Sequence, residues 1–178
     1  MVTRPSKADL AAATSRSIPD VIADGLDILF VGINPGLWSG ATGFHFARPG
    51  NRFWQAIAAA GLVDRVLDPA EQSELLRFGI GITNLVARTT ATAAELSTEE
   101  LRAGGQALVA KVERHRPRQV AFLGISTYRV AFRAPKATIG LQPEPITSAR
   151  AWVLPNPSGL NASWTLSRLA ESYRVLAM

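Results

Sequence analysis

A short apolar run near the start of the chain constrains the fold more than any other feature. Residues 28–31 are apolar and are bounded by Asp27 and Gly32, a pattern typical of a parallel strand that is buried on both faces. Pro35 follows closely, and its ring removes a backbone donor and favours an extended conformation at the preceding Asn34. The sequence therefore predicts that Asn34 is held rigidly at the carboxyl end of a buried strand, where open α/β sheets bind ligands.

The rest of the chain alternates between strand patterns and helix patterns. Further strands are predicted at residues 80–85, 120–123 and 152–154, with a weak strand at 138–141. Helices are predicted at residues 51–61, 68–79, 97–116, 126–132 and 162–176. This alternation predicts an α/β fold, a single three-layer αβα domain with a short, mostly parallel central sheet. We expect this domain over residues 21–178, after a mobile arm or short frayed helix at residues 1–20.

The charge of the chain favours an anionic partner. The 178 residues include 19 Lys or Arg and 14 Asp or Glu, which gives a net charge of +5. Only Lys7, Lys111 and Lys136 are lysine, and the arginine guanidinium is the better fork for phosphate. Mild basicity is common, so composition alone favours nucleic acid only modestly.

Metal sites, cofactors and membranes are not expected. The chain has no cysteine, which excludes disulfides and thiolate-held iron–sulfur clusters. Its two histidines, His45 and His115, are far apart in the sequence, which argues against a structural zinc site. No stretch approaches the ~20 apolar residues of a membrane span. The first residues lack the long apolar region of a secretory signal, so we expect a cytoplasmic protein without a membrane partner.

A second constraint is the order of short motifs along the chain. They are Gly-Ile-Asn-Pro-Gly at 32–36, Gly-Phe-His-Phe at 43–46, Pro-Gly-Asn-Arg-Phe-Trp at 49–54, Gly-Gly at 104–105 and Leu-Pro-Asn-Pro-Ser-Gly-Leu at 154–160. Each motif alone has a simpler interpretation, because Asn-Pro-Gly is a common turn and aromatic residues usually belong to a core. In this order and at these spacings they resemble the mismatch-specific uracil/thymine-DNA glycosylases of the uracil-DNA glycosylase superfamily. The resemblance covers nearly all of the chain after about residue 26.

The resemblance implies a uracil-DNA glycosylase-like fold and a monofunctional enzyme of base excision repair. Such an enzyme extrudes a nucleotide from the duplex, at a cost on the order of a few kcal/mol, before it removes the base by hydrolysis. The implied substrate is uracil opposite guanine in double-stranded DNA, with thymine opposite guanine as a weaker substrate and ethenocytosine as a related one. No lysine lies in the motifs, which argues against Schiff-base chemistry. No cofactor is implied, and we expect a monomer.

Asn34 is the expected catalytic residue. Its carboxamide can accept a hydrogen bond from water but cannot take up a proton at neutral pH, so it would orient the nucleophile without activating it. Better-known uracil glycosylases have Asp in the equivalent motif, so the resemblance implies a slower enzyme that relies on the weakness of the mismatch. Substitution of Asn34 by alanine is expected to abolish base release while largely sparing DNA binding.

The base pocket is expected around residues 43–46. Phe46 is the candidate for stacking on the base, a contact worth roughly 1–3 kcal/mol, although a core position fits the sequence equally well. His45 is interpreted either as an assisting group or as a structural residue. Backbone N–H groups near Ile33 and Phe46 are candidate donors to the base carbonyls. The substrate-binding residues predicted from the resemblance are Ile33, Gly36, Ser39, Gly43, His45, Phe46 and Asn84.

The wedge that fills the gap left by the extruded nucleotide is expected in the last motif. Gly159 permits close backbone approach, and Leu160 is an apolar tip that can enter a base stack. The alternative is an ordinary strand-to-helix loop whose leucine packs on the core. In the family, the main chain of this loop also contacts the unpaired guanine. The predicted DNA-binding residues are Asn156, Pro157, Ser158, Gly159, Leu160, Asn161, Arg48 and Arg52, with Arg88 and Arg150 as further candidate phosphate contacts.

Three positions depart from the family pattern. Ala162 and Ala87 stand where members often have an arginine and an acid, and Asn84 stands where they often have a basic residue. An amide at the end of a strand can bind a pyrimidine edge, so we hypothesise that Asn84 broadens activity to uracil in other contexts, including single-stranded DNA. The main alternative function is a non-catalytic module that binds damaged DNA or another nucleic acid, with Asn34 as a structural turn residue.

Overall fold

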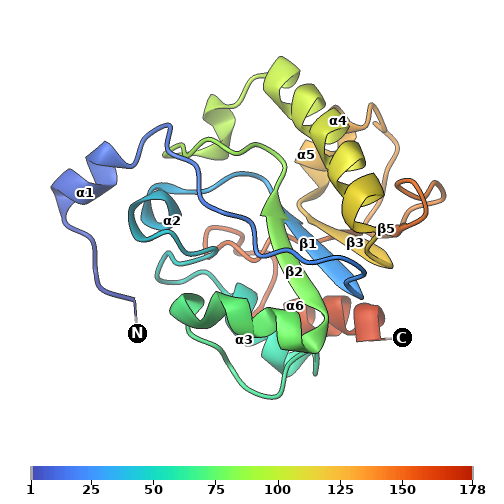
Figure 1. The fold of residues 1–178 in the computed structure, drawn as a ribbon, viewed down its shortest axis with the longest axis horizontal. Helices are drawn as coiled ribbons and strands as arrows, with labels where there is room; N and C mark the ends of the chain where they lie inside the picture. The colour runs from blue at the N-terminus through green and yellow to red at the C-terminus, as the bar shows by residue number, and fades with distance from the viewer. Residues whose placement is uncertain (1, 178) are drawn as a thin grey trace.

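The central sheet has short strands and is mostly parallel. The computed structural model describes residues 2–177. Strands β1 (Ile28–Gly32), β2 (Ile80–Asn84), β3 (Gln119–Leu123) and β5 (Arg150–Leu154) run parallel, and the two-residue β4 (Gly140–Leu141) pairs antiparallel with β5. The order across the sheet is β2-β1-β3-β5-β4, and Figure 1 labels its four parallel strands. The predicted α/β fold with a short, mostly parallel sheet is confirmed.

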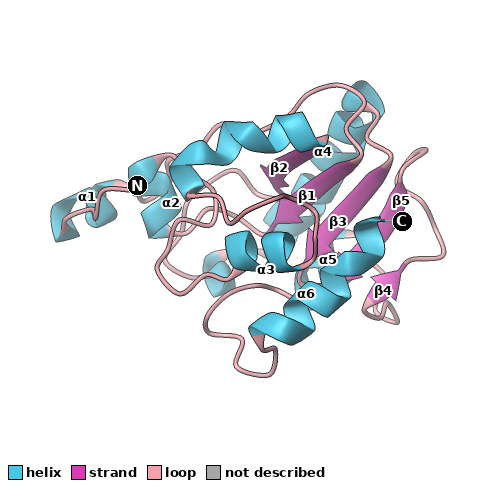
Figure 2. Cartoon of the chain, turned by 90° about the horizontal axis from the view of Figure 1, so that it is seen from below, coloured by secondary structure: helices cyan, strands magenta, loops and turns pink. Residues whose placement is uncertain are grey.

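Helices cover both faces of this sheet (Figure 2). Helices α3 (Phe53–Ala59) and α6 (Leu166–Arg174) pack together on one face, and α4 (Thr98–His115) and α5 (Ile125–Ala131) pack together on the other. The remaining helices are α1 (Lys7–Ala12) and α2 (Leu37–Thr42), which contact each other, and the 3₁₀ segments Pro69–Phe78, Ala93–Glu95 and Val175–Ala177. Within residues 2–177, no helix is both long enough and apolar enough to cross a membrane.

The alternation of side chains along the strands divides the core between the two faces. In β1, Phe30 points to the α3–α6 face, where its ring meets Phe53 edge-on with centroids 5.2 Å apart. The neighbouring Leu29 packs on the α4–α5 face. On that face a glycine lets α4 approach the sheet, because a side chain at Gly104 would lie 2.4 Å from the Leu85 carbonyl oxygen. All of β1 is therefore buried, as its apolar run predicted.

The clearest differences from the predicted helices are at residues 162–176 and 68–79. The last helix begins at Leu166 and not at residue 162, because Thr165 caps it by accepting from the Arg168 N–H and the preceding residues form an irregular loop. Residues 69–78 form a 3₁₀ helix with non-helical backbone at Glu71. Asp68 caps its start by accepting from the Ala70 N–H, and Gly79 ends it with φ 68°.

The amino-terminal residues pack against the domain. Ser6 and Asp9 form a capping box at the start of α1, and Ala13 is fully buried. The Ser15 N–H donates to the Thr89 carbonyl oxygen at 2.9 Å. These contacts give the predicted arm a defined place against the domain, while its mobility stays a prediction.

Candidate active site

A pocket of about 490 Å³ opens at the carboxyl ends of the four parallel strands. Gly32 ends β1, Asn84 ends β2 and Leu123 ends β3, and Asn156 follows β5; all four residues line the pocket. Strand β1 lies between β2 and β3, so the connection that leaves β1 goes to one side of the sheet and the next connection returns to the other side. Such a switch point is where α/β sheets bind ligands.

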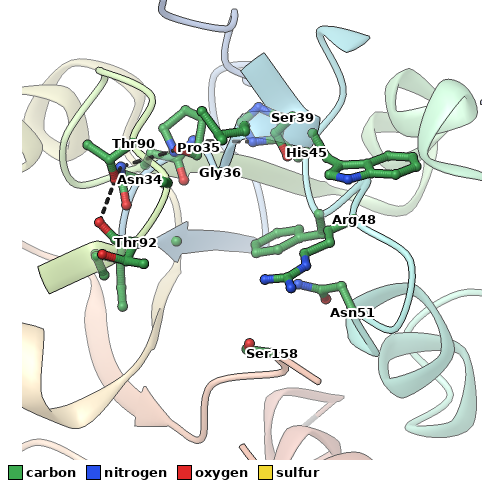
Figure 3. A pocket seen from close by; sticks show the side chains of 18 of the residues that line it. Asn34, Pro35, Gly36, Ser39, His45, Arg48, Asn51, Thr90, Thr92 and Ser158 are labelled. Carbon is green, nitrogen blue, oxygen red and sulfur yellow. Dashed lines mark hydrogen bonds between the residues drawn. The ribbon is translucent and has the colours of Figure 1, made fainter. Parts of the chain in front are cut away.

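Asn34 is held in this pocket by its amide nitrogen. The Nδ2 atom donates to the Arg88 carbonyl oxygen at 2.9 Å. It also donates to Thr90 Oγ1 at 2.7 Å and to the Pro35 carbonyl oxygen at 3.2 Å (Figure 3). Carbonyl oxygens only accept, so these partners fix which end of the amide is nitrogen. The Oδ1 atom is left to accept a hydrogen bond, which suits a group that orients water.

Thr90 completes the support of Asn34, and sequence reasoning missed it. Thr90 is 1% exposed, and its hydroxyl donates to the Thr92 carbonyl oxygen at 2.8 Å (Figure 3). The hydroxyl proton is thus committed to Thr92, which leaves an oxygen lone pair to accept from Asn34. The signal in the sequence is weak, because residues 88–90 are only a polar run after a buried strand. They reach Asn34 because β2 is the neighbour of β1.

Phe46 lies over the end of β1. Its backbone has φ 53°, in the left-handed region that residues other than glycine rarely adopt. Its ring stacks on Phe53, with centroids 4.1 Å apart and planes 25° apart. A side chain at Gly32 would lie 3.4 Å from Phe46 Cζ. Phe46 therefore fits both interpretations offered by the sequence, since it packs on the core and also lines the pocket.

His45 is buried and orients Asn84. It is 2% exposed, and its Nε2 lies 2.9 Å from the Pro19 carbonyl oxygen, which can only accept, so Nε2 carries the proton. Burial lowers the pKa of His45, against smaller opposing effects of Pro19 and Asp20, so the ring is neutral at pH 7. Nδ1 is then an acceptor, 3.4 Å from Asn84 Nδ2. The Asn84 Oδ1 atom faces away from the ring and lies 2.6 Å from where a Cβ of Gly32 would be.

The loop after α2 is shaped by a residue that the sequence did not single out. Gln72 accepts from the His45 N–H at 2.8 Å and donates to the Gly43 carbonyl oxygen at 3.3 Å. Gly43 ends α2 with φ 79° and is not among the described residues that line the pocket. The structure thus places Gly43 in the turn that ends α2, and its contact with a base stays a prediction. The other predicted residues of this region do line the pocket, namely Ile33, Gly36 and Ser39.

Residues 155–164, the Leu160 loop, form the wall on the β5 side. Leu160 is 78% exposed and lines the pocket together with Asn156 and Ser158. Its side chain is therefore not packed on the core, and the alternative of an ordinary loop with a buried leucine is wrong. Asn34 lines the same pocket, so the predicted water-orienting amide and the predicted wedge share one cleft.

The interior of the Leu160 loop is held by its own polar groups. Asn156 Oδ1 accepts from the Ser158 N–H at 2.9 Å, and Asn161 Nδ2 donates to the Asn156 carbonyl oxygen at 3.0 Å. Gly159 is required by a close approach, because a side chain there would lie 2.6 Å from the Gly50 carbonyl oxygen. The predicted DNA-binding residues that shape the loop without being among the described pocket-lining residues are Pro157, Gly159 and Asn161.

The four arginines predicted around the cleft have different surroundings. Arg48 is exposed and lines the pocket (Figure 3). Arg88 pairs with Glu100, and its hydrogen bonds are the main reason why the pKa of that carboxyl is about 2. Arg150 begins β5, so it lies at the amino ends of the parallel strands, whereas the cleft is at their carboxyl ends. Arg52 donates to backbone carbonyls of the Leu160 loop, so its surroundings differ from those expected of a phosphate contact.

Comparison with known proteins identifies the family and the fold. The family model described as the Uracil DNA glycosylase superfamily matches residues 19–177. The chain belongs to the uracil DNA glycosylase superfamily. A solution NMR structure of a candidate uracil DNA glycosylase from Methanosarcina acetivorans has a TM-score of 0.63 and 20% identity, over 92% of this chain and 99% of that chain. This second match shows a shared fold. The superfamily consists of DNA glycosylases, so DNA is the partner of this chain.

This glycosylase also has a pocket wall that lies outside the matched region. The superfamily match begins at residue 19, yet Leu10 of α1 and Ile18 both line the pocket. Ile18 precedes Pro19, whose carbonyl oxygen binds His45. The motifs gave no indication of this wall, because the residues that form it precede them in the chain.

Proposed function

We propose that this superfamily member is a monofunctional, mismatch-specific DNA glycosylase that hydrolyses uracil from G·U pairs in base excision repair. The observation that carries the proposal is that Asn34 and the exposed Leu160 line one pocket. A water-orienting amide and an apolar plug in one cleft are what an enzyme needs to extrude a nucleotide and attack its sugar. The net charge of +5 and the exposed Arg48 favour attraction to DNA phosphates.

In the proposed mechanism, Asn34 Oδ1 accepts a hydrogen bond from a water that faces C1′ of the extruded deoxyribose. The glycosidic bond breaks, its electron pair leaves with the base, and the sugar takes on oxocarbenium character. The water oxygen then bonds to C1′, and one of its protons passes to the base or to solvent. Asn34 contributes orientation alone, because an amide cannot take that proton. Within residues 2–177, the Phe46 N–H has no protein acceptor, which makes it a candidate donor to a base carbonyl.

Asn84 supplies base specificity in this proposal. Its NH₂ group faces His45, so its oxygen is the end that accepts from a base. Uracil and thymine carry an N–H at N3, whereas cytosine has a lone pair there that would repel an amide oxygen. Phe46 adds a stack worth roughly 1–3 kcal/mol that does not depend on base identity.

The same contacts bear differently on three further substrates. Asn84 does not need the opposite strand, so we expect some activity on uracil in single-stranded DNA. Thymine opposite guanine is expected to be a weaker substrate, since its methyl group must also fit the pocket. Ethenocytosine lacks an N–H at N3, so its removal at the rate of uracil would argue against recognition by Asn84.

Hydrolysis without a covalent intermediate is favoured by the positions of the lysines. Lys111 Nζ donates to the Asp20 carboxylate and to Thr83 Oγ1, the latter at 2.7 Å. Lys7, Lys111 and Lys136 are all absent from the described residues that line the pocket. A Schiff base needs an amine within reach of C1′, and none of these lysines offers one.

One assay tests the proposed function. A labelled duplex with a single G·U pair is incubated with excess protein and then treated with alkali, which cleaves the strand at an abasic site. We expect strand cleavage at the uracil and free uracil in solution, with less product from a G·T duplex and none from G·C. A gel shift without alkali-labile sites would instead support a module that only binds DNA.

A further inference from the structure

The guanidinium of Arg52 hydrogen-bonds to the backbone of the Leu160 loop at four points. Arg52 lies directly before α3 and is half-buried. Its side chain reaches four carbonyl oxygens: Nε lies 3.4 Å from that of Pro157, Nη2 lies 2.6 Å from that of Ser158 and 3.0 Å from that of Asn161, and Nη1 donates to that of Trp164. The Arg52 N–H also donates to the Pro157 carbonyl oxygen at 3.0 Å.

Arg52 adds to the few backbone bonds that the loop makes by itself. The Asn161 N–H donates to the Ser158 carbonyl oxygen at 2.9 Å and the Trp164 N–H to that of Asn161 at 3.3 Å, while Arg52 also reaches the carbonyls of Pro157 and Trp164. Between the end of β5 at Leu154 and the start of α6 at Leu166 the chain has no regular structure, so no ladder of N–H groups satisfies the carbonyls. A guanidinium presents five donors in a planar fork, whereas a lysine ammonium presents three donors from one point. Only arginine can therefore serve several separated carbonyls from one position.

Arg52 and its neighbours constrain the backbone of the Leu160 loop, and the side chain at the tip of the loop stays exposed. The loop backbone packs closely against residue 50, since a side chain at Gly159 would lie 2.6 Å from the Gly50 carbonyl oxygen. At its base, the buried Tyr173 hydroxyl donates to the Pro155 carbonyl oxygen at 2.8 Å. Leu160, at the tip, remains 78% exposed at the pocket. The backbone is thus constrained on one side while the apolar side chain projects on the other.

We propose that Arg52 is a positioning residue that preorganises the Leu160 loop for insertion into the duplex, and that it is not a phosphate contact. The inference rests on the proposed function, because insertion matters only if the enzyme extrudes a nucleotide. A loop already in its binding conformation loses less entropy when it binds. A shift of about 1 Å in a positioned group can cost roughly a hundredfold in rate.

Lysine at position 52 separates the two roles, because it keeps the charge and loses the fork. We expect R52K to lower the single-turnover excision rate on a G·U duplex roughly 10- to 100-fold. Its Kd should rise by less than the rate falls, because the loop loses more entropy on binding while the phosphate contacts remain, and its salt dependence should be unchanged. A 2-aminopurine beside the uracil should show a smaller rise in fluorescence on binding, since extrusion is impaired.

Arg48 provides the matched control, because it is exposed and lines the same pocket. R48M should weaken binding and reduce the slope of log K against log salt by about 0.9 for one lost phosphate contact. R48K keeps the charge, so its affinity and its salt slope should match those of the wild type. R52M loses both the charge and the fork, and R52K should excise uracil as slowly as R52M. Restoration of excision by R52K, or a reduced salt slope in R52M matching that of R48M, would overturn the proposal.

Hydrogen exchange of the free protein tests the anchor without catalysis. In R52K, exchange should rise in residues 155–164 and stay unchanged elsewhere. A rise throughout the chain would show that Arg52 holds the whole fold, and no rise would show that it holds nothing; either result contradicts the proposal. If the wild-type protein releases no uracil, the proposed function fails, while this arm still decides whether Arg52 anchors the loop.

Discussion

The loops after β1 and after β5 resemble each other in sequence but are held in opposite ways. Both place an asparagine before a proline at the end of a buried strand. Asn34 uses its own side-chain NH₂ for anchoring and keeps its oxygen for the pocket. The second loop has internal bonds from Asn156 and Asn161, but an outside residue, Arg52, also binds its backbone, and the Leu160 side chain remains exposed. An orienting atom must itself be fixed, whereas a plug needs only a fixed backbone beneath a free side chain.

The largest effect is expected from the fixed amide. Asn34→Ala removes the oxygen that orients water, so single-turnover release of uracil should fall at least about a hundredfold. Binding should change little, because Asn34 contacts no phosphate in the proposed mechanism. Rapid-quench excision gives the release rate, and a binding titration on the same G·U duplex gives the Kd. Excision at the wild-type rate would remove Asn34 from the mechanism.

A smaller effect is expected from the plug. Leu160→Ala should slow excision from a G·U duplex roughly tenfold, or ~1.4 kcal/mol, because the vacated space in the stack is no longer filled. Single-stranded uracil-DNA has no stack to open, so its rate should be unchanged. Equal losses on both substrates would show that Leu160 supports the pocket and does not act as a wedge.

The support of the amide can be tested with two adjacent threonines. Thr90→Val removes the hydroxyl that accepts from Asn34, and excision should fall about fivefold, as for a lost hydrogen bond of ~1 kcal/mol. Thr89 is also fully buried, but its hydroxyl has no partner among the described residues. Thr89→Val should therefore leave excision unchanged and leave stability equal or slightly higher. Equal losses in both variants would contradict the assigned role of Thr90.

The smallest effect concerns the pH dependence of stability. The pKa of His45 is lowered from 6.5, mainly by burial. The unfolded chain then binds the proton more readily than the folded chain, so the stability from neutral His45 is present above pH 6.5 and is lost as pH falls through the lowered pKa. Below about pH 6.5 the Tm of the wild type should fall more steeply than that of His45→Gln. Parallel Tm curves would contradict this.

The fold was largely predictable, because its signals are local. The apolar run of β1 specifies a buried strand, and Ser97 with Glu100 forms the capping box that begins α4, both without reference to distant residues. The start of α6 was predicted too early, since apolar periodicity does not show that residues 155–164 bind Arg52.

The site was predictable only where side chains lie in the motifs. Asn34, Phe46 and Leu160 do line one pocket. Thr90 was missed because its role depends on the pairing of β1 with β2. The sequence predicted Arg52 only as a DNA-binding residue, because a sequence does not show that backbone carbonyls of residues 157–164 surround its guanidinium.

The most direct test is a structure of the wild-type protein bound to a duplex with a 2′-fluoro analogue of deoxyuridine opposite guanine, which the enzyme cannot cleave. We predict uracil stacked on Phe46, a water between Asn34 Oδ1 and C1′, and Leu160 in the space the nucleotide has left. A uridine still stacked in the duplex, or a sugar whose C1′ is remote from Asn34, would contradict the account.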